Sequence, residues 1–514
     1  MSVRYLVTII VLVSCLSWVS SCRKDFEVDA SNGDLQFSKD TVFLDTVFTN
    51  IGSSTYSLKV LNRSGKDIEI PSIRLQDGDN SKYRLNVEGV AGNSFVNVPL
   101  YARDSLYIFI ETTYDIAPDN LTEFLYIDDL LFDSGANEQR IPLVTLVKDA
   151  VFLYPSTLAN GSKESLLLGL DEQGNELRIE GFILTDDELN ITNEKPYVIY
   201  GYAAVSAGKT LSIQEGARLH FHKDSGILVG SGGSIKILGS ASDDPVLLDK
   251  EVIFEGDRLE PEFSDVPGQW GTLWLAPGSV ENEISYLTLK NATIGILAEG
   301  NPGASSPTLR IRNSQVYNST LVNLWARNTS ITAENLILGN SGSHSLYCNL
   351  GGTYSFIHTT IANYWSNSFR TGTALKLDSY EIDNSGNPSG ADLLKADFIN
   401  CIIDGNTSRE LTLLSTAEFD FNFLFSHVLL KFVDTGGQFT SNPLYDFADT
   451  SMYDTVLLNT AVNFLDAVDN DFRINPNSSA AGIGDLDAAL LVPFDLLGRE
   501  RNTSPAVGAY QPEL

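Results

Sequence analysis

The sequence predicts an all-β chain in which a β-sandwich is followed by a solenoid of parallel strands. Three observations predict this fold class. Short runs of alternating apolar and polar residues, the pattern of half-buried strands, recur from residue 35 onward. No run shows sustained helical periodicity. Beyond residue 308, apolar strings that end in Asn recur at intervals of 22 and 23 residues, which is typical of coils that stack on one another.

The composition of the 514-residue chain excludes several classes of protein. Apolar residues make up 43% and charged residues 19%, enough to bury a core, so wholesale disorder is excluded. The 66 acidic and 34 basic residues give a formal charge of −32. Such a chain repels phosphate backbones, so nucleic acid is not expected as a partner. Four cysteines are too few for a disulfide scaffold or a Cys-rich zinc protein.

Residues 1–21 are predicted to be a lipoprotein signal peptide. Arg4 is their only charge, and an apolar run over residues 6–19 follows it. Residues 19–22 resemble the lipobox of bacterial lipoproteins, in which the cysteine becomes the acylated N-terminus. The resemblance implies lipid attachment at Cys22 and a mature charge of 33 − 66 = −33.

The residues around Cys22 leave alternatives open. A second string, which ends at Cys15, also fits the lipobox; Cys22 is favoured because apolar residues continue past Cys15. An ordinary signal peptide with a passive cysteine is the other interpretation. Residues 23–27 resemble the tag that sends lipoproteins of Bacteroidota-type bacteria to the outer face of the outer membrane, although Phe26 interrupts it. The resemblance implies a lipid-anchored, surface-exposed outer-membrane protein, with the side that the anchor faces left open.

Residues 22–34 are polar and are predicted to be a linker, and residues 35–150 are predicted to form an immunoglobulin-like β-sandwich. Alternating strings such as residues 56–61 and 105–110 are separated by turn signals. Seven or eight short strands at this spacing are typical of an antiparallel sandwich. No Cys-Trp-Cys core is present, so the prediction concerns the architecture rather than the antibody subfamily.

Residues 151–514 are predicted to form a parallel β-helix with a C-terminal cap. The recurring strings end at Asn318, Asn340, Asn363 and Asn406. The last interval of 43 residues accommodates one coil and a loop-like insert over residues 383–390. Strands of successive coils would stack ~4.8 Å apart, which places apolar residues in columns inside and Asn or Ser at the turns.

Several strings of this region point to a known family. They are the Gly-spaced strings of residues 208–239, residues 267–273 and 282–289, and the closing string of residues 505–510. Together they resemble right-handed parallel β-helix proteins of the pectin-lyase-like superfamily, over roughly residues 200–511. The resemblance implies a right-handed single-stranded parallel β-helix. It also makes a polysaccharide lyase or glycoside hydrolase the alternative function.

No catalytic residue, metal site or cofactor is predicted. Hydrolases of this superfamily use clustered Asp residues with Gly-His-Gly and Arg-Ile-Lys strings, and neither string occurs. Glu334 is the only acid in residues 301–377, so a calcium cluster is not expected there. His220 and His222 would project from the same side of a strand, but a third metal ligand is not evident.

The central coils supply the candidate ligand-binding residues. Residues 301–377 carry five basic residues and one acid, a charge of 5 − 1 = +4 within a strongly acidic chain. Arginine forks bind uronates or sulfates, and aromatic faces hold sugars. The candidates carry one of these two kinds of side chain: Arg310, Arg312, Trp325, Arg327, Tyr364, Trp365 and Arg370.

We expect the four arginines to line one solvent face, with Tyr364 or Trp365 nearby. The alternative is that these coils are simply poor in charge, with their aromatic residues stacked inside. Exposed positions cannot be told from buried ones without the register of the coils.

The predicted function is therefore a non-catalytic surface lipoprotein whose β-helix serves in adhesion or glycan binding. Its expected partners are the membrane, through the lipid anchor, and an acidic polysaccharide or other surface proteins. Four Asp-Ser/Thr-apolar strings match the O-glycosylation pattern of secreted proteins of Bacteroidota-type bacteria, at Thr41, Thr46, Ser105 and Thr455. Cys348 and Cys401 lie in apolar strings and are expected to be buried and unpaired.

Overall fold

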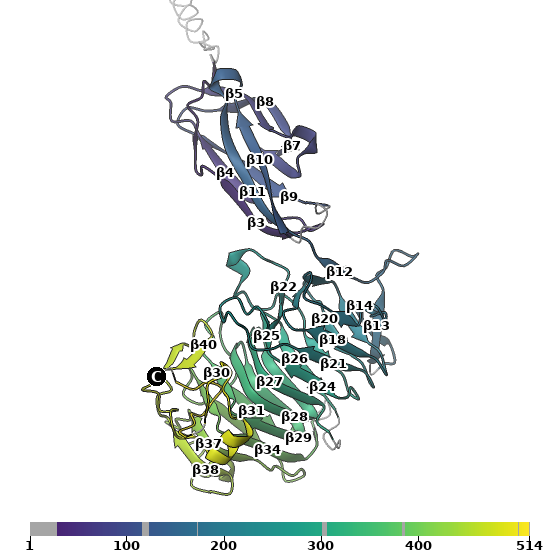
Figure 1. The fold of residues 1–514 in the computed structure, drawn as a ribbon, viewed down its shortest axis with the longest axis vertical. Helices are drawn as coiled ribbons and strands as arrows, with labels where there is room; N and C mark the ends of the chain where they lie inside the picture. Colours follow the sequence, from purple (N-terminus) through teal and green to yellow (C-terminus); the bar gives the residue numbers. More distant parts are fainter. Residues whose placement is uncertain are drawn as a thin grey trace, which may run out of the picture. The chain divides into compact units, whose positions relative to one another are not determined.

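The structure is a computed structural model of the chain, and it describes residues 28–115, 123–171, 173–300, 306–382, 386–501 and 503–512. It divides into two compact units, residues 1–149 and 150–514 (Figure 1). The predicted fold class is confirmed: strands dominate both units, and a sandwich precedes a long, mostly parallel sheet. The predicted signal peptide and Cys22 lie outside the described residues. No helix of the described part is long and apolar enough to cross a membrane.

The first unit is a β-sandwich of two mostly antiparallel sheets. One sheet has the order β1-β5-β10-β11-β3, with β8 paired to β5, and the other has the order β2-β4-β9-β6-β7. Their bounds are β1 Asp29–Ala30, β2 Gln36–Phe37, β3 Val42–Phe48, β4 Tyr56–Leu61, β5 Ile68–Leu75, β6 Tyr83–Val87, β7 Val90–Gly92, β8 Ser94–Leu100, β9 Ser105–Thr112, β10 Glu123–Phe132 and β11 Gln139–Lys148. Fully buried residues of both sheets, such as Tyr83, Ile108 and Leu130, form one core.

The second unit winds a 25-stranded sheet into coils. Parallel pairing between strands of successive coils produces three ladders, which we call ladders 1, 2 and 3. Each ladder is one face of the β-helix, and side chains within a strand alternate between the core and the surface. Long strands run around a corner and contribute to two ladders.

Ladder 1 contains the following strands and segments: β15 Asn190–Ile191, β18 Thr210–Gln214, β21 Ser234–Leu238, β24 Asn282–Ser285, residues 309–312 of β27 Leu309–Ser319, residues 329–334 of β28 Val322–Ser341, residues 352–357 of β29 His344–Ile357, β34 Leu393–Ile399, and the start of β37 Leu424–Leu430.

Ladder 2 contains β14 Glu176–Ile183, β17 Tyr202–Val205, β20 Gly226–Val229, β23 Leu273–Leu275, β26 Ile294–Glu299, residues 322–327 of β28, residues 344–349 of β29, β31 Leu375–Asp378 and β36 Leu411–Leu414. Its strand β14 also forms a hairpin with β13 Ser165–Leu170.

Ladder 3 contains β12 Val151–Leu153, β16 Tyr197–Ile199, β19 Arg218–Phe221, β22 Val252–Gly256, β25 Leu287–Lys290, residues 315–319 of β27, residues 336–341 of β28, β30 Thr360–Asn363, β35 Ile402–Gly405, and the ends of β37 and of β38 Tyr453–Leu458.

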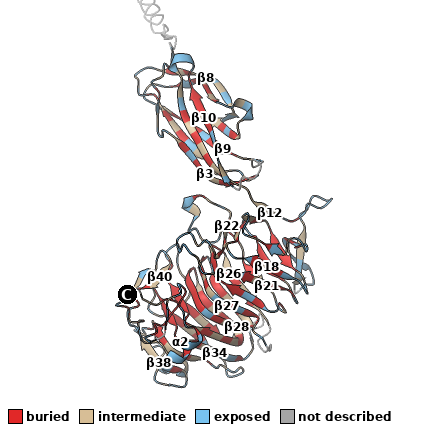
Figure 2. Ribbon diagram, in the orientation of Figure 1, coloured by how far each residue is buried: buried red, intermediate tan, exposed pale blue. Residues whose placement is uncertain are grey.

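Inward-facing residues stack in columns along the unit. In ladder 2, one column consists of residues in direct register that are all 0% exposed: Leu273, Ile296, Leu324, Leu346 and Leu375. Figure 2 shows this buried lining along the coils. Cys348 and Cys401 belong to the same core, are 0% exposed and form no disulfide, which confirms the expectation for both thiols.

The corner between ladders 1 and 3 uses left-handed backbone in coil after coil. Its residues have φ between 48° and 54°: Tyr286, Asn313, Asn335, His358, Asn400 and His427. Asn adopts this conformation more readily than other non-Gly residues. Asn291, Asn318 and Asn340 form a similar column at the next corner, where Asn318 Nδ2 donates to Asn291 Oδ1 at 2.6 Å. The recurring Asn residues therefore mark corners.

The C-terminal segment packs on ladder 3. It contains the hairpin of β39 Phe464–Asp466 and β40 Asp471–Ile474, and the helix α2 Leu486–Leu491. Gly339 makes room for the ring of Phe472, because a Cβ at that glycine would lie 2.2 Å from the ring. Before this segment the coils end at β38, which pairs with β37; within the described ranges no strand pairs with the other edge of β38.

Candidate functional site

Ladder 2 carries a row of aromatic and charged side chains on its outer side. Trp325 is in register with Tyr347, and Tyr347 with Lys376. The rings of Trp325 and Tyr347 stack with centroids 5.6 Å apart and an interplanar angle of 17°, and both residues are half-buried. We call this surface the Trp325 face and define it by Trp274, Glu299, Trp325, Arg327, Tyr347, Asn349, Lys376, Asp378 and Glu381.

Arg327 lies between two carboxylates on this face. Its Nη1 is 3.3 Å from Glu299 Oε1, and its Nη2 is 3.8 Å from Glu381 Oε2. Its Nε donates to Asn349 Oδ1 at 3.2 Å, and the guanidinium lies 5.8 Å from the Trp325 ring centre. The cation is therefore neutralised locally and held beside the aromatic surface.

Asp378 fixes the other end of the Trp325 face. Its carboxylate accepts a hydrogen bond from the Tyr347 hydroxyl at 2.7 Å and another from Asn349 Nδ2 at 2.8 Å. Lys376 Nζ lies 3.2 Å from Asp378 Oδ2 and 4.2 Å from the centre of the Tyr347 ring. Burial, followed by the charge of Asp378, raises the pKa of Tyr347 far above its ordinary value, so the hydroxyl stays protonated. The Tyr347 ring is thus held in one orientation.

Arg310 and Arg312 lie on ladder 1, and both are exposed. Their register neighbours are Glu283 and Glu334, respectively. The four side chains border a pocket of about 320 Å³. The acids that face these arginines therefore come from neighbouring coils.

The remaining candidates lie elsewhere on the coils. Tyr364 follows β30 on ladder 3, and its hydroxyl donates to Asp404 Oδ2 at 2.7 Å. Trp365 is 4% exposed, and its Nε1 donates to Ser368 Oγ at 3.0 Å. The side chain of Arg370 is 4% exposed and pairs with a carboxylate inside the fold.

The expectation that the four arginines share one solvent face is wrong. Arg310 and Arg312 are on ladder 1, Arg327 is on ladder 2, and the Arg370 side chain is buried. The physical reason is that the chain passes through all three ladders within about 22 residues, so nearness in sequence does not fix the ladder. What the structure does bring together is Trp325 and Arg327, with Tyr347 from the next coil.

Sequence reasoning missed the carboxylates of the Trp325 face. Glu299, Asp378 and Glu381 lie just outside residues 301–377 and reach the face from neighbouring coils. His220, singled out in the sequence, is buried, with its Nδ1 3.6 Å from Glu255 Oε1. Among the described residues no group of three His, Cys, Asp or Glu side chains is placed to hold a metal ion.

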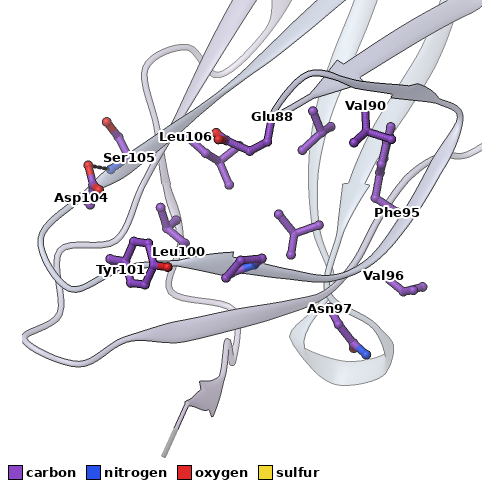
Figure 3. A pocket seen from close by; sticks show the side chains of 13 residues that line it. Glu88, Val90, Phe95, Val96, Asn97, Leu100, Tyr101, Asp104, Ser105 and Leu106 are labelled. Atoms are coloured by element: carbon purple, nitrogen blue, oxygen red, sulfur yellow. Dashed lines mark hydrogen bonds between the residues drawn. The ribbon is translucent and has the colours of Figure 1, made fainter. Parts of the chain in front are cut away.

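The β-sandwich holds a cleft of its own, of about 550 Å³, beside β8 and the start of β9. Figure 3 shows Val90, Phe95, Leu100 and Leu106 around it, with Glu88 at its border. A ligand pocket usually adds a few convergent polar groups to such an apolar lining. The Trp325 face has such groups in greater number, so we place the candidate site in the second unit.

No family model and no curated protein matches the chain. Among solved structures, the chain is similar to the catalytic unit of a thermostable GH87 α-1,3-glucanase from Streptomyces thermodiastaticus strain HF3-3, with 10% identity over 72% of this chain and 83% of that chain and a TM-score of 0.29. The Agl-KA catalytic domain shows 11% identity over 74% and 80% of the two chains, with a TM-score of 0.20. A PapD-like domain of human CEP192 shows 8% identity over 23% and 86%, with a TM-score of 0.16. These TM-scores are low, and the likenesses carry no argument about activity.

Proposed function

We propose that the second unit is a non-catalytic glycan-binding β-helix and that the Trp325 face contacts the glycan. The observation that carries this proposal is the stacked pair of Trp325 and Tyr347. The two rings cover one face of each other, and Lys376 Nζ lies over the Tyr347 ring. A sugar would therefore contact the outer edges of the stack, whose aromatic C–H groups are apolar and held in fixed geometry. The side chains of Arg327 and Lys376, which flank the pair, supply donors for sugar hydroxyls.

The charge of the Trp325 face favours a neutral glycan. Arg327 and Lys376 face Glu299, Asp378 and Glu381, a local balance of 2 − 3 = −1. A polyanion would meet net repulsion there. The predicted acidic polysaccharide therefore depends on Arg310 and Arg312 alone and stays a prediction.

The hydrogen bonds and ion pairs of the carboxylates on the Trp325 face support binding rather than catalysis. Glu299 accepts a hydrogen bond from Trp274 Nε1 at 2.7 Å and also pairs with Arg327. Asp378 accepts from Tyr347 and Asn349. A general acid must present a proton to the scissile bond, whereas these carboxylates are engaged with protein donors. Polysaccharide cleavage by a lyase or hydrolase is the alternative function.

We further propose that the protein acts at the cell surface. The support is the sequence alone: the lipobox-like string that ends at Cys22, and the short tag after it. A lipid anchor followed by a sandwich would hold a glycan-binding β-helix outside the membrane.

Affinity electrophoresis tests the proposed function. Native gels that contain mannan, β-glucan or arabinoxylan are compared with a gel without polysaccharide. We expect the wild type to be retarded in at least one of them, and Trp325→Ala to lose about tenfold in affinity, since an aromatic contact is worth up to ~1.5 kcal/mol. Tyr154→Ala, which removes an aromatic residue that is 62% exposed outside the face, is the matched control and should bind as the wild type does.

Two results would contradict the proposal. One is a wild type that runs unretarded in all of these gels. The other is a Trp325→Ala variant that binds as tightly as the wild type. Shortening of the polysaccharide during incubation, measured by size-exclusion chromatography, would favour the lyase or hydrolase.

A further inference from the structure

We propose that a second sugar site, separate from the Trp325 face, lies where the C-terminal segment meets ladder 3, and that it binds a single neutral sugar residue through a vicinal diol. The site is a pocket of about 470 Å³. The lining residues that carry the argument are Tyr364, Asp404, Lys431, Val433, Val462 and Phe464.

One corner of the pocket is charged. Asp404 is only 9% exposed at its side chain, and Lys431 is 33% exposed. Asp404 Oδ2 accepts from the Tyr364 hydroxyl at 2.7 Å, and Oδ1 accepts from the Gly405 amide at 2.8 Å. Lys431 Nζ lies 3.9 Å from Asp404 Oδ1 and donates to the Gly405 carbonyl. Both charged groups are thus held in place. A carboxylate can accept about four hydrogen bonds and an ammonium can donate three, so the bonds described here leave capacity on each for a ligand.

The rest of the lining combines an apolar part with the polar side chains of Asn459, Thr460 and Asn463. The rings of Tyr364 and Phe464 meet edge to face, at 90° and 6.0 Å between centroids. Val433 and Val462 also line the pocket. An apolar wall beside polar groups matches the two sides of a sugar ring, whose C–H face is apolar and whose hydroxyls lie around the edge.

The charged corner selects a ligand that both donates and accepts. Lys431 repels a metal ion or an amine from Asp404, and Asp404 repels a phosphate or carboxylate from Lys431. An ionised carboxylate only accepts hydrogen bonds, and an ammonium only donates. Two adjacent hydroxyls of a neutral sugar meet both needs, because one donates to Asp404 and the other accepts from Lys431. Hydrogen bonds to charged groups are the stronger ones.

The pocket is independent of the proposed glycan surface. Tyr364 and Asp404 belong to ladder 3, whereas Trp325 belongs to ladder 2. The two sites can therefore be tested apart, and the failure of one leaves the other standing.

Saturation-transfer NMR on the full chain, with the methyl glycosides of glucose, galactose, mannose and N-acetylglucosamine as probes, tests the pocket. We expect saturable binding of at least one glycoside. Asp404→Asn and Lys431→Met should each weaken it about tenfold, the loss expected when one hydrogen bond to a charged group is removed. Lys431→Met is the safer variant, because Lys431 is partly exposed and Asp404 is buried. Lys395→Met, which alters a half-exposed lysine paired with Asp397 on ladder 1, is the matched control and should bind as the wild type does.

Two outcomes of this experiment would overturn the proposal, and two further comparisons separate the pocket from the Trp325 face. No saturable binding of any of the four glycosides would do so, and so would equal affinity in wild type and Lys431→Met. Trp325→Ala, measured beside Lys431→Met, separates the two surfaces: binding that is lost in Trp325→Ala and kept in Lys431→Met would place the ligand on the Trp325 face instead. Lys431→Met should also leave polysaccharide retention in the gels unchanged, which separates failure of the pocket from failure of the proposed function.

Discussion

Arg370 and Glu410 form an ion pair whose side chains are only 4% and 0% exposed. The guanidinium also donates to the carbonyl oxygens of Asn363 and Gly372. Glu410 Oε2 accepts from the Ala374 amide at 2.9 Å. The pair therefore joins three separate parts of the chain, and its polar atoms are satisfied by the protein rather than by a ligand.

Arg370→Met is expected to destabilise the second unit by about 3–5 kcal/mol, because it leaves the Glu410 carboxylate buried without a cation. Chemical denaturation followed by tryptophan fluorescence measures the loss. Lys395→Met breaks an exposed pair with Asp397 and should cost less than about 1 kcal/mol. Equal losses in the two variants would contradict the structural role of Arg370.

His344 makes stability depend on pH. Burial, with a smaller part from the charge of Lys376, lowers the pKa of His344 from 6.5 to about 4. The fold thus favours the neutral imidazole, whereas the unfolded chain takes up the proton near pH 6.5. The stability that His344 contributes is therefore fully present above pH 6.5. As the pH falls from 6.5 toward 4, the free energy of unfolding decreases by about 3 kcal/mol. We expect His344→Gln to lose less stability than the wild type between pH 7 and 4. An NMR titration that gives His344 an ordinary pKa would refute this.

Arg310 and Arg312 give a test of the acidic-polysaccharide prediction. The double variant Arg310→Ala/Arg312→Ala should be retained less than the wild type in a polygalacturonate gel. Added salt should likewise reduce the retention of the wild type, because it screens exposed charges. Both residues are exposed, so the thermal midpoint should stay within a few degrees. Arg63→Ala/Arg103→Ala makes the same change of charge in the sandwich and serves as the control. Equal retention of the two double variants would contradict a role of Arg310 and Arg312 in binding an acidic polysaccharide.

Cys22 is expected to anchor the protein. Cys22→Ala should move the protein from the membrane fraction to the soluble fraction, because acyl chains are the strong membrane-binding element that the sequence predicts. Fractionation and intact mass check this. A wild-type mass without diacylglycerol on Cys22 would argue for an ordinary signal peptide.

Thr455 is the most accessible of the four predicted O-glycosylation positions. It is exposed, whereas Thr41, Thr46 and Ser105 are half-buried. Its hydroxyl donates to the carboxylate of Asp454 at 3.1 Å. We expect peptide mass spectrometry of native protein to find glycan mass on Thr455 more often than on the other three. Unmodified peptides at all four positions would count against the pattern.

The fold could be predicted from the sequence because it repeats. The Asn strings that end at Asn318 and Asn340 recur where the chain takes a left-handed turn, and that turn favours Asn. The corner between ladders 1 and 3 was harder to recognise in the sequence, because His358 and His427 take the place of Asn there. A corner requires a residue with positive φ, and several residue types can adopt it. The recurring Asn therefore marks only some of the corners.

The site was harder to predict, for a geometric reason. The neighbours of Trp325 along ladder 2 are Leu297 and Tyr347, which lie a full coil away in sequence. A charge count over residues 301–377 therefore missed Glu299 and Glu381, which pair with Arg327. The aromatic and arginine side chains were recognisable by type, but their grouping required the register of the coils.

The single-sided pairing of β38 has a consequence for self-association. An unpaired strand edge is a template on which another chain can add a strand, and a stack of similar coils would extend readily in this way. Asp454 is exposed on that strand, and the chain carries a formal charge of −32, so two copies repel each other as they approach. A glycan on Thr455 of the same strand would add a steric shield. Charge thus opposes the addition of a second copy at this end of the β-helix, and the predicted glycan on Thr455 would add to that effect.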